Sequence, residues 1–327
     1  MAIFTSRGNG SFKLTDWIHS DNHKLIDTPG KVRMLIEALL LLRGSWVCYL
    51  DLTGTRPCED SVTSVLSLYL TPPPSEIRSF HCLYTVDICA LGSSAFTTCL
   101  VGDKTMSLKG FLEARNTPIV VFEAKRITDR LSSHFGVNVK NVKELQLMEC
   151  ATLGREKDDL YDFGTLMARD WFKAGLDLPW IESWTDIHLA ANKSLDPLEG
   201  GTLHDYCLRP LTHFFVAYCV KDVLCFPNFH RLYGSQLVQQ WDDMSEAPDG
   251  PEKELLWWRV ADPKMCSSRE PAYAVQEPWF EPKKMDLCLG YSNPKGPMGG
   301  KQNKRKRKHQ EIDPSVTGER TTCSAAT

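Results

Sequence analysis

The stretch Trp46-Val47-Cys48-Tyr49-Leu50-Asp51-Leu52-Thr53-Gly54-Thr55 decides the fold that the sequence predicts. An apolar run of this composition forms a buried strand that delivers the carboxylate of Asp51 to the end of a sheet. A buried carboxylate is costly unless a positive group meets it, and a divalent cation is the usual one. Asp-x-x-Gly also closes many ordinary strands, so the stretch alone leaves a metal ligand and a structural acid as alternatives.

Length and apolar pattern exclude several classes of protein. The 327 residues suit a core of about 200 residues with appendages. The longest apolar run, residues 34–42, is interrupted by Glu37 and is much shorter than the ~20 residues of a membrane span. The N-terminus lacks a basic and then apolar secretory pattern, so we expect a protein that is neither secreted nor bound to a membrane. The cysteines form no Cys-x-x-Cys pair, which argues against a structural zinc site.

The formal net charge of −3 is unevenly distributed along the chain. Residues 301–327 contain seven Lys and Arg against three Asp and Glu, whereas the other 300 residues contain 31 basic and 38 acidic side chains. Such a body is not a bulk phosphate binder of the histone type. Any nucleic acid that it handles must be met locally or through metal ions.

The order of predicted elements indicates a mixed α/β sheet. Asp27-Thr28-Pro29 starts a helix of about four turns, and three strands follow, of which the Asp51 strand is the first. Helices and strands then alternate, which favours a mixed sheet over a parallel one. The further predicted elements are strands over 61–70 and 80–91, a helix over 107–114, a strand over 119–122, a helix over 127–135, an extended segment over 142–147 and a long helix over 210–233 that Pro227 kinks or splits.

Two later stretches place further acids in or near helices. In Val120-Val121-Phe122-Glu123-Ala124-Lys125-Arg126-Ile127-Thr128-Asp129-Arg130-Leu131 a strand stops, and Asp129 follows near the beginning of a helix. In Tyr218-Cys219-Val220-Lys221-Asp222 the tyrosine and the aspartate are four residues apart and share one helical face. Taken singly, each residue has a plainer interpretation: Asp129 as an acid favoured by the helix dipole, Asp222 as a solvated acid and Tyr218 as a core tyrosine.

Together these motifs resemble a known family. Asp51-Leu52-x-Gly54, Thr128-Asp129-x-Leu131 and Tyr218-x-x-x-Asp222 occur in the order of the DEDD 3′–5′ exonucleases, and the tyrosine is similar to that of the ribonuclease D-like (DEDDy) branch. Residues 118–147 and Leu208-Arg209-Pro210-Leu211 also resemble fungal members of this group. The resemblance spans about residues 28–235. It implies a ribonuclease H-like α/β fold, with a mixed sheet flanked by helices.

The resemblance also implies a chemistry, the hydrolysis of phosphodiester bonds from the 3′ end of single-stranded RNA or DNA. In that family two Mg²⁺ or Mn²⁺ ions about 4 Å apart flank the phosphate, and carboxylates hold them because these ions prefer hard oxygen ligands. By this resemblance Asp51 would bridge the ions, Asp129 would hold the second and Asp222 the first. Tyr218 would orient the attacking water.

One ligand of the family pattern is missing. The first motif of the family is Asp-x-Glu, and Thr53 stands in the place of the glutamate. A hydroxyl is a neutral, weak ligand, so three carboxylates are present where the pattern has four. Glu59, Asp60 and Asp87 are near in sequence, but nothing in the sequence shows that one of them substitutes.

Two functions are therefore compatible with the sequence. One is a 3′–5′ exonuclease weakened by Thr53, and the other is a catalytically degenerate exonuclease fold that binds nucleic acid or a protein. The three acids and Tyr218 favour the enzyme, which is the expected function, whereas Thr53 favours the binding module, which is the alternative.

Other candidate residues give weaker signals. Trp171, Trp180, Trp184 and Trp257-Trp258 could stack on bases, although packing is the favoured expectation. His134, His204 and His213 show no spacing typical of a metal site.

We expect four regions along the chain. They are an N-terminal arm over 1–27, an exonuclease-like domain over 28–240, an irregular Trp- and Pro-rich extension packed on it over 241–295, and a disordered basic tail over 296–327. Lys304-Arg305-Lys306-Arg307-Lys308 predicts a nuclear localisation signal and hence a nuclear or nucleocytoplasmic protein. A nucleic-acid patch and a solvated charge run are the alternatives for this block.

Overall fold

The computed structural model describes residues 14–41, 46–54, 63–72, 81–100, 102–154, 160–195, 201–202 and 206–245. Its strands are β1 (His23–Ile26), β2 (Val47–Gly54), β3 (Thr63–Thr71), β4 (Cys82–Asp87), β5 (Cys99–Leu100), β6 (Asp103–Ser107), β7 (Ile119–Val121) and β8 (Val142–Glu144). Its helices are α1 (Leu14–Ile18), α2 (Pro29–Leu41), α3 (Ile88–Leu91), α4 (Ser94–Thr97), α5 (Leu108–Glu113), α6 (Ala124–Phe135), α7 (Leu145–Thr152), α8 (Phe163–Asp170), α9 (Leu178–Leu195), α10 (His213–Val220) and α11 (Phe226–Ser245).

The main sheet has six strands in the order β1-β4-β3-β2-β7-β8. β3 runs antiparallel to both of its neighbours, whereas β2, β7 and β8 run parallel to one another. The five neighbouring strands β4, β3, β2, β7 and β8 therefore have the order and directions of the ribonuclease H-like fold. The structure confirms the predicted fold class, a mixed α/β sheet flanked by helices.

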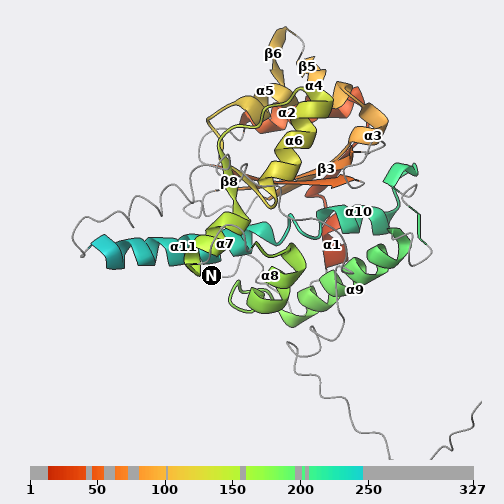
Figure 1. Cartoon of the computed structure of the whole chain (residues 1–327). Helices are drawn as coiled ribbons and strands as arrows, with labels where there is room; N and C mark the ends of the chain where they lie inside the picture. Colours follow the sequence, from red (N-terminus) through yellow and green to blue (C-terminus); the bar gives the residue numbers. More distant parts are fainter. Residues whose placement is uncertain are drawn as a thin grey trace, which may run out of the picture.

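Helices cover both faces of this sheet (Figure 1). On one face α2, α5 and α6 pack with Leu50, Leu66 and Val121. On the other face the later helices pack with the alternate residues of the same strands, such as Tyr49, Tyr69 and Val120. Side chains of a strand alternate between the two faces of its sheet, so Asp51 lies on the same face as Tyr49. This is the face on which α10 and α11 are placed.

Most of the predicted elements are present, and their local causes are visible. The helix predicted after Asp27-Thr28-Pro29 is α2, which buries Val32, Leu35, Ile36 and Leu39. The helix predicted to close at Gly136 is α6, and Gly136 takes the left-handed conformation of a C-terminal cap. The long helix predicted over residues 210–233 is split into α10 and α11, and Pro227 lies in the first turn of α11.

The structure differs from the sequence expectation at two strands. Residues His23–Ile26 lie within the expected N-terminal arm, yet they form β1 and pair in parallel with β4. The strand expected over residues 80–91 ends at Asp87, because the side chain of Asp87 accepts a hydrogen bond from Ala90 N and starts α3. An apolar run that continues from a strand into a helix does not show this boundary.

Several predictions concern residues outside the described ranges. They include the extension beyond Ser245, the basic tail with its Lys304–Lys308 block, and the acids Glu59 and Asp60. The boundaries of the 28–240 domain stay a prediction. None of the helices in the described ranges is long and apolar enough to cross a membrane.

Candidate active site

The candidate site forms where β2 extends beyond the end of β7. Leu50 pairs with Val121, the last residue of β7, so Asp51 is the next position along β2. The chain leaves β7 at the same level, passes Glu123 and enters α6. Parallel strands deliver their carboxyl ends to one edge of a sheet, and this edge therefore brings Asp51 and the beginning of α6 together.

Contacts from the sheet hold α10 over this edge. Ser67, which pairs with Asp51 across β2 and β3, donates a hydrogen bond of 2.9 Å to the carbonyl of Cys219. Ahead of α10, Arg209 donates two hydrogen bonds to Asp87, of 2.6 Å and 2.7 Å. The bidentate geometry fixes the approach of α10 from β4. Tyr218 and Asp222 are thereby placed on the Asp51 side of the sheet.

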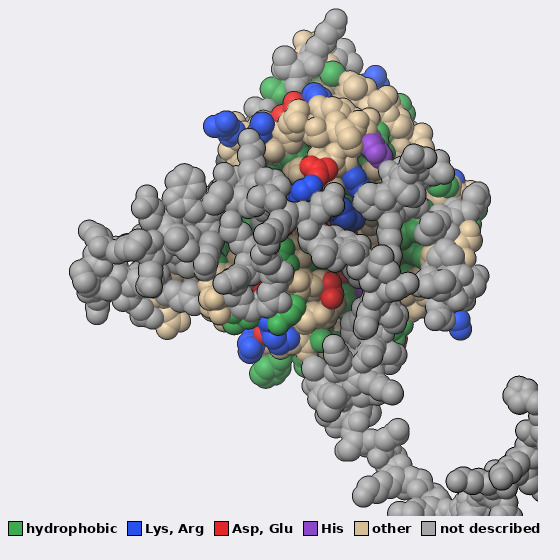
Figure 2. Space-filling model, in the orientation of Figure 1, with side chains coloured by type: hydrophobic (Ala, Val, Ile, Leu, Met, Phe, Trp, Pro, Cys, Tyr) green, Lys and Arg blue, Asp and Glu red, His purple; other side chains and the backbone are tan. Residues whose placement is uncertain are grey.

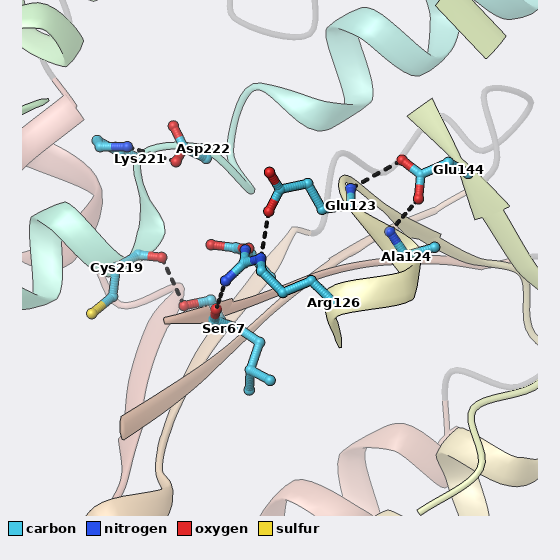
Figure 3. A network of polar contacts seen from close by, with 10 residues as sticks. Ser67, Glu123, Ala124, Arg126, Glu144, Cys219, Lys221 and Asp222 are labelled. Carbon is cyan, nitrogen blue, oxygen red and sulfur yellow. Dashed lines mark hydrogen bonds and ion pairs between the residues drawn. The ribbon is translucent and has the colours of Figure 1, made fainter. Parts of the chain in front are cut away.

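Arg126 is the cation nearest to the end of β2. Its Nη2 atom lies 3.8 Å from Asp51 Oδ1, and its Nη1 atom donates a hydrogen bond of 3.2 Å to the Leu52 carbonyl. Its Nε atom donates to the carboxylate of Glu123 (Figure 3). The distance to Asp51 is too long for a hydrogen bond, so the attraction between the two is Coulombic.

A second cation, Lys221, is buried beside Asp222. Its side chain is 3% exposed, and its Nζ atom lies 2.6 Å from Asp222 Oδ2. The same ammonium lies 5.0 Å from the ring centroids of both Trp184 and Tyr218, within cation–π range. The other oxygen of Asp222 accepts a hydrogen bond of 2.8 Å from Trp184 Nε1. Both oxygens of Asp222 are therefore bound by groups of the chain itself.

Both cations and Asp222 affect the pKa of Asp51. Burial raises the pKa of Asp51 to about 6, the positive charges of Arg126 and Lys221 oppose that rise, and Asp222 adds to it. These mutual effects show that Asp51, Asp222 and the two cations occupy one electrostatic neighbourhood. At neutral pH most Asp51 side chains are ionised, because the pKa lies about one unit below.

Tyr218 lies at this site but its hydroxyl already has a partner. Burial raises the pKa of Tyr218 well above its usual range, and a hydrogen bond to the side chain of Tyr206 contributes in the same direction. The ring lies beside the Lys221 ammonium. The structure thus brings three of the four predicted catalytic residues, Asp51, Tyr218 and Asp222, to one place.

Asp129 has a different environment. Its carboxylate is 63% exposed and pairs at 2.7 Å with Lys125, one turn earlier on α6. Within the described ranges, no group of three or more His, Cys, Asp or Glu side chains is arranged to hold a metal ion. The roles predicted for Asp51, Asp129, Tyr218 and Asp222 stay predictions, and the geometry gives Asp129 no contact that supports one.

Thr53, which stands at the position of the missing glutamate, contacts α10. Thr53 is 9% exposed, and its hydroxyl hydrogen-bonds the thiol of Cys219 on α10. Asp87, which the sequence left open as a substitute ligand, is engaged by Arg209 and by the first turn of α3. Neither residue supplies a fourth carboxylate to Asp51.

The side chains present do not fit the two-metal arrangement that the resemblance implies. Such a site needs several carboxylates whose oxygens point to shared ions. Here Asp222 is bound on both oxygens, Asp51 faces Arg126, Thr53 bonds to Cys219, and Asp129 is exposed and paired with Lys125. No chemical step through bound metal ions follows from this arrangement.

The sequence interpretation missed Arg126, Lys221 and Glu123. The sequence gives no signal that Glu123 is buried, yet its side chain is 15% exposed and binds Arg126. The signal was present in part, because Arg126 and Lys221 each lie within three residues of a predicted ligand. Spacing alone did not show that their charged ends would turn toward the acids.

Glu144 occupies the N-terminus of α6. Its carboxylate accepts a hydrogen bond of 3.0 Å from Glu123 N and another from Ala124 N (Figure 3). It supports Glu123 in a left-handed conformation, with φ of 59°. Burial raises the pKa of Glu144 to about 8, and the hydrogen bonds from the backbone of Ala124, Gln146 and Glu123 oppose that rise. The approach of Arg126 to β2 thus rests on a start of α6 that these hydrogen bonds hold in place.

Two of the tryptophans that the sequence singled out are buried. Trp180 and Trp184 are 2% and 1% exposed, which confirms the packing interpretation for both, and Trp184 in addition binds Asp222. His134 lies 3.5 Å from the hydroxyl of Thr63, and His213 is exposed and packs edge to face with His19. On the face seen in Figure 2, the described basic and acidic side chains lie interspersed, in agreement with a body that is not a bulk phosphate binder.

Comparison with known proteins gives matches at the level of the fold. No protein-family model matches the sequence, and no curated protein matches it either. Among solved structures, ribonuclease D from Trypanosoma brucei in complex with GMP is 16% identical, with 73% of this chain and 71% of that chain covered and a TM-score of 0.48.

Two further solved structures match over about half of their own length. Ribonuclease D from Escherichia coli, an exoribonuclease involved in structured RNA processing, is 16% identical, with 73% of this chain and 50% of that chain covered and a TM-score of 0.45. The catalytic core of RRP6 from Trypanosoma brucei is 14% identical, with 67% and 48% covered and a TM-score of 0.44. The TM-scores of all three structures lie below 0.5, so the fold assignment rests on the sheet of this chain, whose strand order is that of a ribonuclease H-like fold.

Proposed function

We propose that this chain is an exonuclease-like domain that binds the 3′ end of a single nucleic-acid strand without hydrolysing it. The observation that carries the proposal is the state of Asp222, whose two oxygens are bound by Trp184 and Lys221. Each of these oxygens keeps a second lone pair, but an ion at Asp222 would have to compete with a buried ammonium 2.6 Å away. The degenerate alternative of the sequence interpretation is thereby the better supported one.

Binding of a strand is supported by the chemistry at the edge of the sheet. Arg126 is 34% exposed there, and the ring of Tyr218 is partly buried beside it. Arginine and aromatic side chains are the groups with which single-strand binding sites hold phosphates and stack bases. The resemblance of the motifs to exonucleases adds the expectation of a 3′ end.

A metal-dependent 3′–5′ exonuclease is the second candidate, favoured by the proximity of Asp51, Tyr218 and Asp222. In that case Mg²⁺ or Mn²⁺ would be held by Asp51, Asp222 and Asp129, and would supply the activation of water and the stabilisation of the leaving oxygen. Asp129 would need to leave Lys125 for this purpose, and Asp222 would need to leave Lys221.

The two candidates are separated by incubation of a 5′-labelled single-stranded RNA and a matching DNA with the protein in Mg²⁺ and in Mn²⁺. Wild type is compared with Asp51→Ala and with Thr53→Glu. We expect wild type to bind both the RNA and the DNA, seen as retarded bands in a gel-shift assay. We also expect it to produce no ladder of 3′-shortened products from either one. A ladder that disappears in Asp51→Ala would establish the enzyme instead.

The same experiment tests the kind of partner. A 3′-phosphorylated strand and a strand with a free 3′-hydroxyl are compared, because a 3′-end site must distinguish them. Absence of binding to every strand would redirect the proposal to a protein partner.

We also propose nuclear import through Lys304-Arg305-Lys306-Arg307-Lys308, on the basis of five consecutive cations. A fluorescent fusion is expected to enter the nucleus, and a fusion in which the five residues are replaced by glutamine is expected to lose nuclear enrichment. Equal distribution of the two fusions would contradict the import signal.

A further inference from the structure

We propose that Arg126 and Lys221 act as built-in cations in place of the divalent ions of this site, so that the folded chain binds no divalent metal at Asp51 and Asp222. The inference rests on the proposed non-hydrolytic function, but it concerns a separate property of the site. It states which groups balance the charge of the two acids.

Lys221 takes one cation position. Its ammonium lies 2.6 Å from Asp222 Oδ2 and is enclosed by the rings of Trp184 and Tyr218, each with its centroid at 5.0 Å. With 3% of its side chain exposed, the ammonium cannot leave Asp222 without losing these contacts in a largely buried position. A metal ion at Asp222 would need to displace a charge that the surrounding rings also stabilise.

Arg126 takes the other cation position. The guanidinium is bound to the Glu123 carboxylate and to the Leu52 carbonyl, and it lies 3.8 Å from Asp51. Burial lowers the pKa of Arg126, but the negative charges of Glu123 and Asp51 outweigh it and raise the pKa further above its usual value. Arg126 is therefore a permanent cation, which cannot give up its charge to admit a metal ion.

Each of the two acids already has a cation of the chain beside it. Asp51 faces Arg126 and Asp222 faces Lys221, while Glu123 also binds Arg126, so the five groups carry a formal charge of −1 without any added ion. A divalent ion placed among them would be repelled by two cations whose nitrogen atoms lie 3.8 Å from Asp51 and 2.6 Å from Asp222. Thr53, which stands at the glutamate position of the family pattern, supplies no carboxylate to offset this repulsion.

The test uses Mn²⁺ alone as the probe, with protein that has first been treated with EDTA. Binding is measured from the loss of the electron paramagnetic resonance signal of Mn²⁺ in solution, and stability is measured as the thermal midpoint with and without Mn²⁺. Asp51→Asn is the comparison variant, since any ion held at this site depends on Asp51. We expect the Mn²⁺ titrations of wild type and Asp51→Asn to coincide, and the wild-type thermal midpoint to be the same in EDTA and in Mn²⁺.

A gain-of-binding variant makes the test positive as well as negative. This variant carries three substitutions. Thr53→Glu adds the missing carboxylate, Arg126→Met removes the guanidinium, and Lys221→Met removes the second cation while keeping the length of the aliphatic side chain. We expect Mn²⁺ binding and a rise in thermal midpoint that Asp51→Asn abolishes. Thr53→Glu combined with Lys31→Met is the matched control, because Lys31 pairs at 2.8 Å with Asp27 at an exposed position.

Two results would overturn the proposal. One is Mn²⁺ binding by wild type that is lost in Asp51→Asn, and the other is a folded gain-of-binding variant that takes up no more Mn²⁺ than its control. If that variant does not fold, the wild-type comparison decides alone. Wild type that binds Mn²⁺ but produces no ladder would defeat this inference only, whereas a ladder would defeat the proposed function.

Discussion

Lys221 and Asp222 are adjacent residues whose charged groups depend on each other. The ammonium is almost fully buried, and Asp222, with 23% of its side chain exposed, provides its only full countercharge at hydrogen-bond distance among the described contacts. A buried ion pair adds little net stability by itself, yet removal of one partner leaves a charge without compensation. The acid of the predicted catalytic motif therefore has a structural role.

We predict that Asp222→Asn lowers the free energy of unfolding by about 3 kcal/mol, because it leaves the Lys221 ammonium buried and unpaired. Urea denaturation followed by tryptophan fluorescence measures the change. Asp129→Asn is the matched control, and its effect should stay within about 0.5 kcal/mol because its pair with Lys125 is exposed. The double variant Lys221→Met/Asp222→Asn should recover part of the loss, and no recovery would argue against the pairing as the cause.

At the scale of elements, α11 is joined to the central strand β2 through His230. His230 Nδ1 shares a hydrogen bond of 3.1 Å with the Tyr49 hydroxyl, and the two rings pack edge to face at 5.8 Å. Burial lowers the pKa of His230 to about 4, and the charge of Lys143 acts in the same direction. The contact is therefore built for the neutral imidazole.

This contact predicts a dependence of stability on pH. The unfolded chain binds a proton at His230 near pH 6.5, and the folded chain does so only near pH 4, so the stabilisation is complete above pH 6.5 and is lost as the pH falls through that window. The full difference is worth about 3 kcal/mol. Urea denaturation at a series of pH values should show a shallower acid slope for His230→Gln than for wild type, whereas His19→Gln, an exposed control, should keep the wild-type slope.

The sequence predicts elements well where a local pattern causes them. Val32, Leu35, Ile36 and Leu39 mark α2 by their spacing, and Gly136 marks the end of α6. β1 escapes prediction because four residues of mixed polarity carry no period, and only pairing with β4 makes them a strand. Such pairing joins residues about sixty positions apart and leaves no local trace.

The candidate site divides in the same way. The apolar run before Asp51 predicts its strand, although β2 continues to Gly54. The spacing of Tyr218 and Asp222 predicts one helical face, although α10 ends at Val220 and Asp222 lies in the turn that follows. The partners of these acids are not predictable from spacing: Arg126 reaches Asp51 across 75 positions, and Trp184 reaches Asp222 across 38. Whether an acid faces a metal ion or a built-in cation depends on such long-range contacts.

At the scale of the whole molecule, the N-terminal segment closes one side of the structure. β1 covers the outer edge of β4, and α1 contributes Leu14 and Trp17 to the core, at 0% and 8% exposed. Ile26 of β1 is 2% exposed. The sheet therefore ends in a short strand instead of the fully buried β4.

Deletion of residues 1–27 should accordingly cost about 5 kcal/mol, from the loss of three buried side chains, and should expose the edge of β4 to other chains. Urea denaturation measures the stability, and size-exclusion chromatography measures self-association. A deletion of residues 1–13 removes none of the described residues and serves as the control. A 1–27 deletion that matches this control in both measurements would show that β1 is dispensable.

The Lys221–Asp222 pair also constrains how this site can change over generations. A substitution at either position alone leaves the other charge buried without a partner, so each single change passes through a less stable protein. A lineage that moves between a metal-holding and a cation-holding site must then alter both positions together, or first gain stability elsewhere. The two arrangements are separated by a stability barrier in sequence space, and a site that has acquired the lysine tends to keep it.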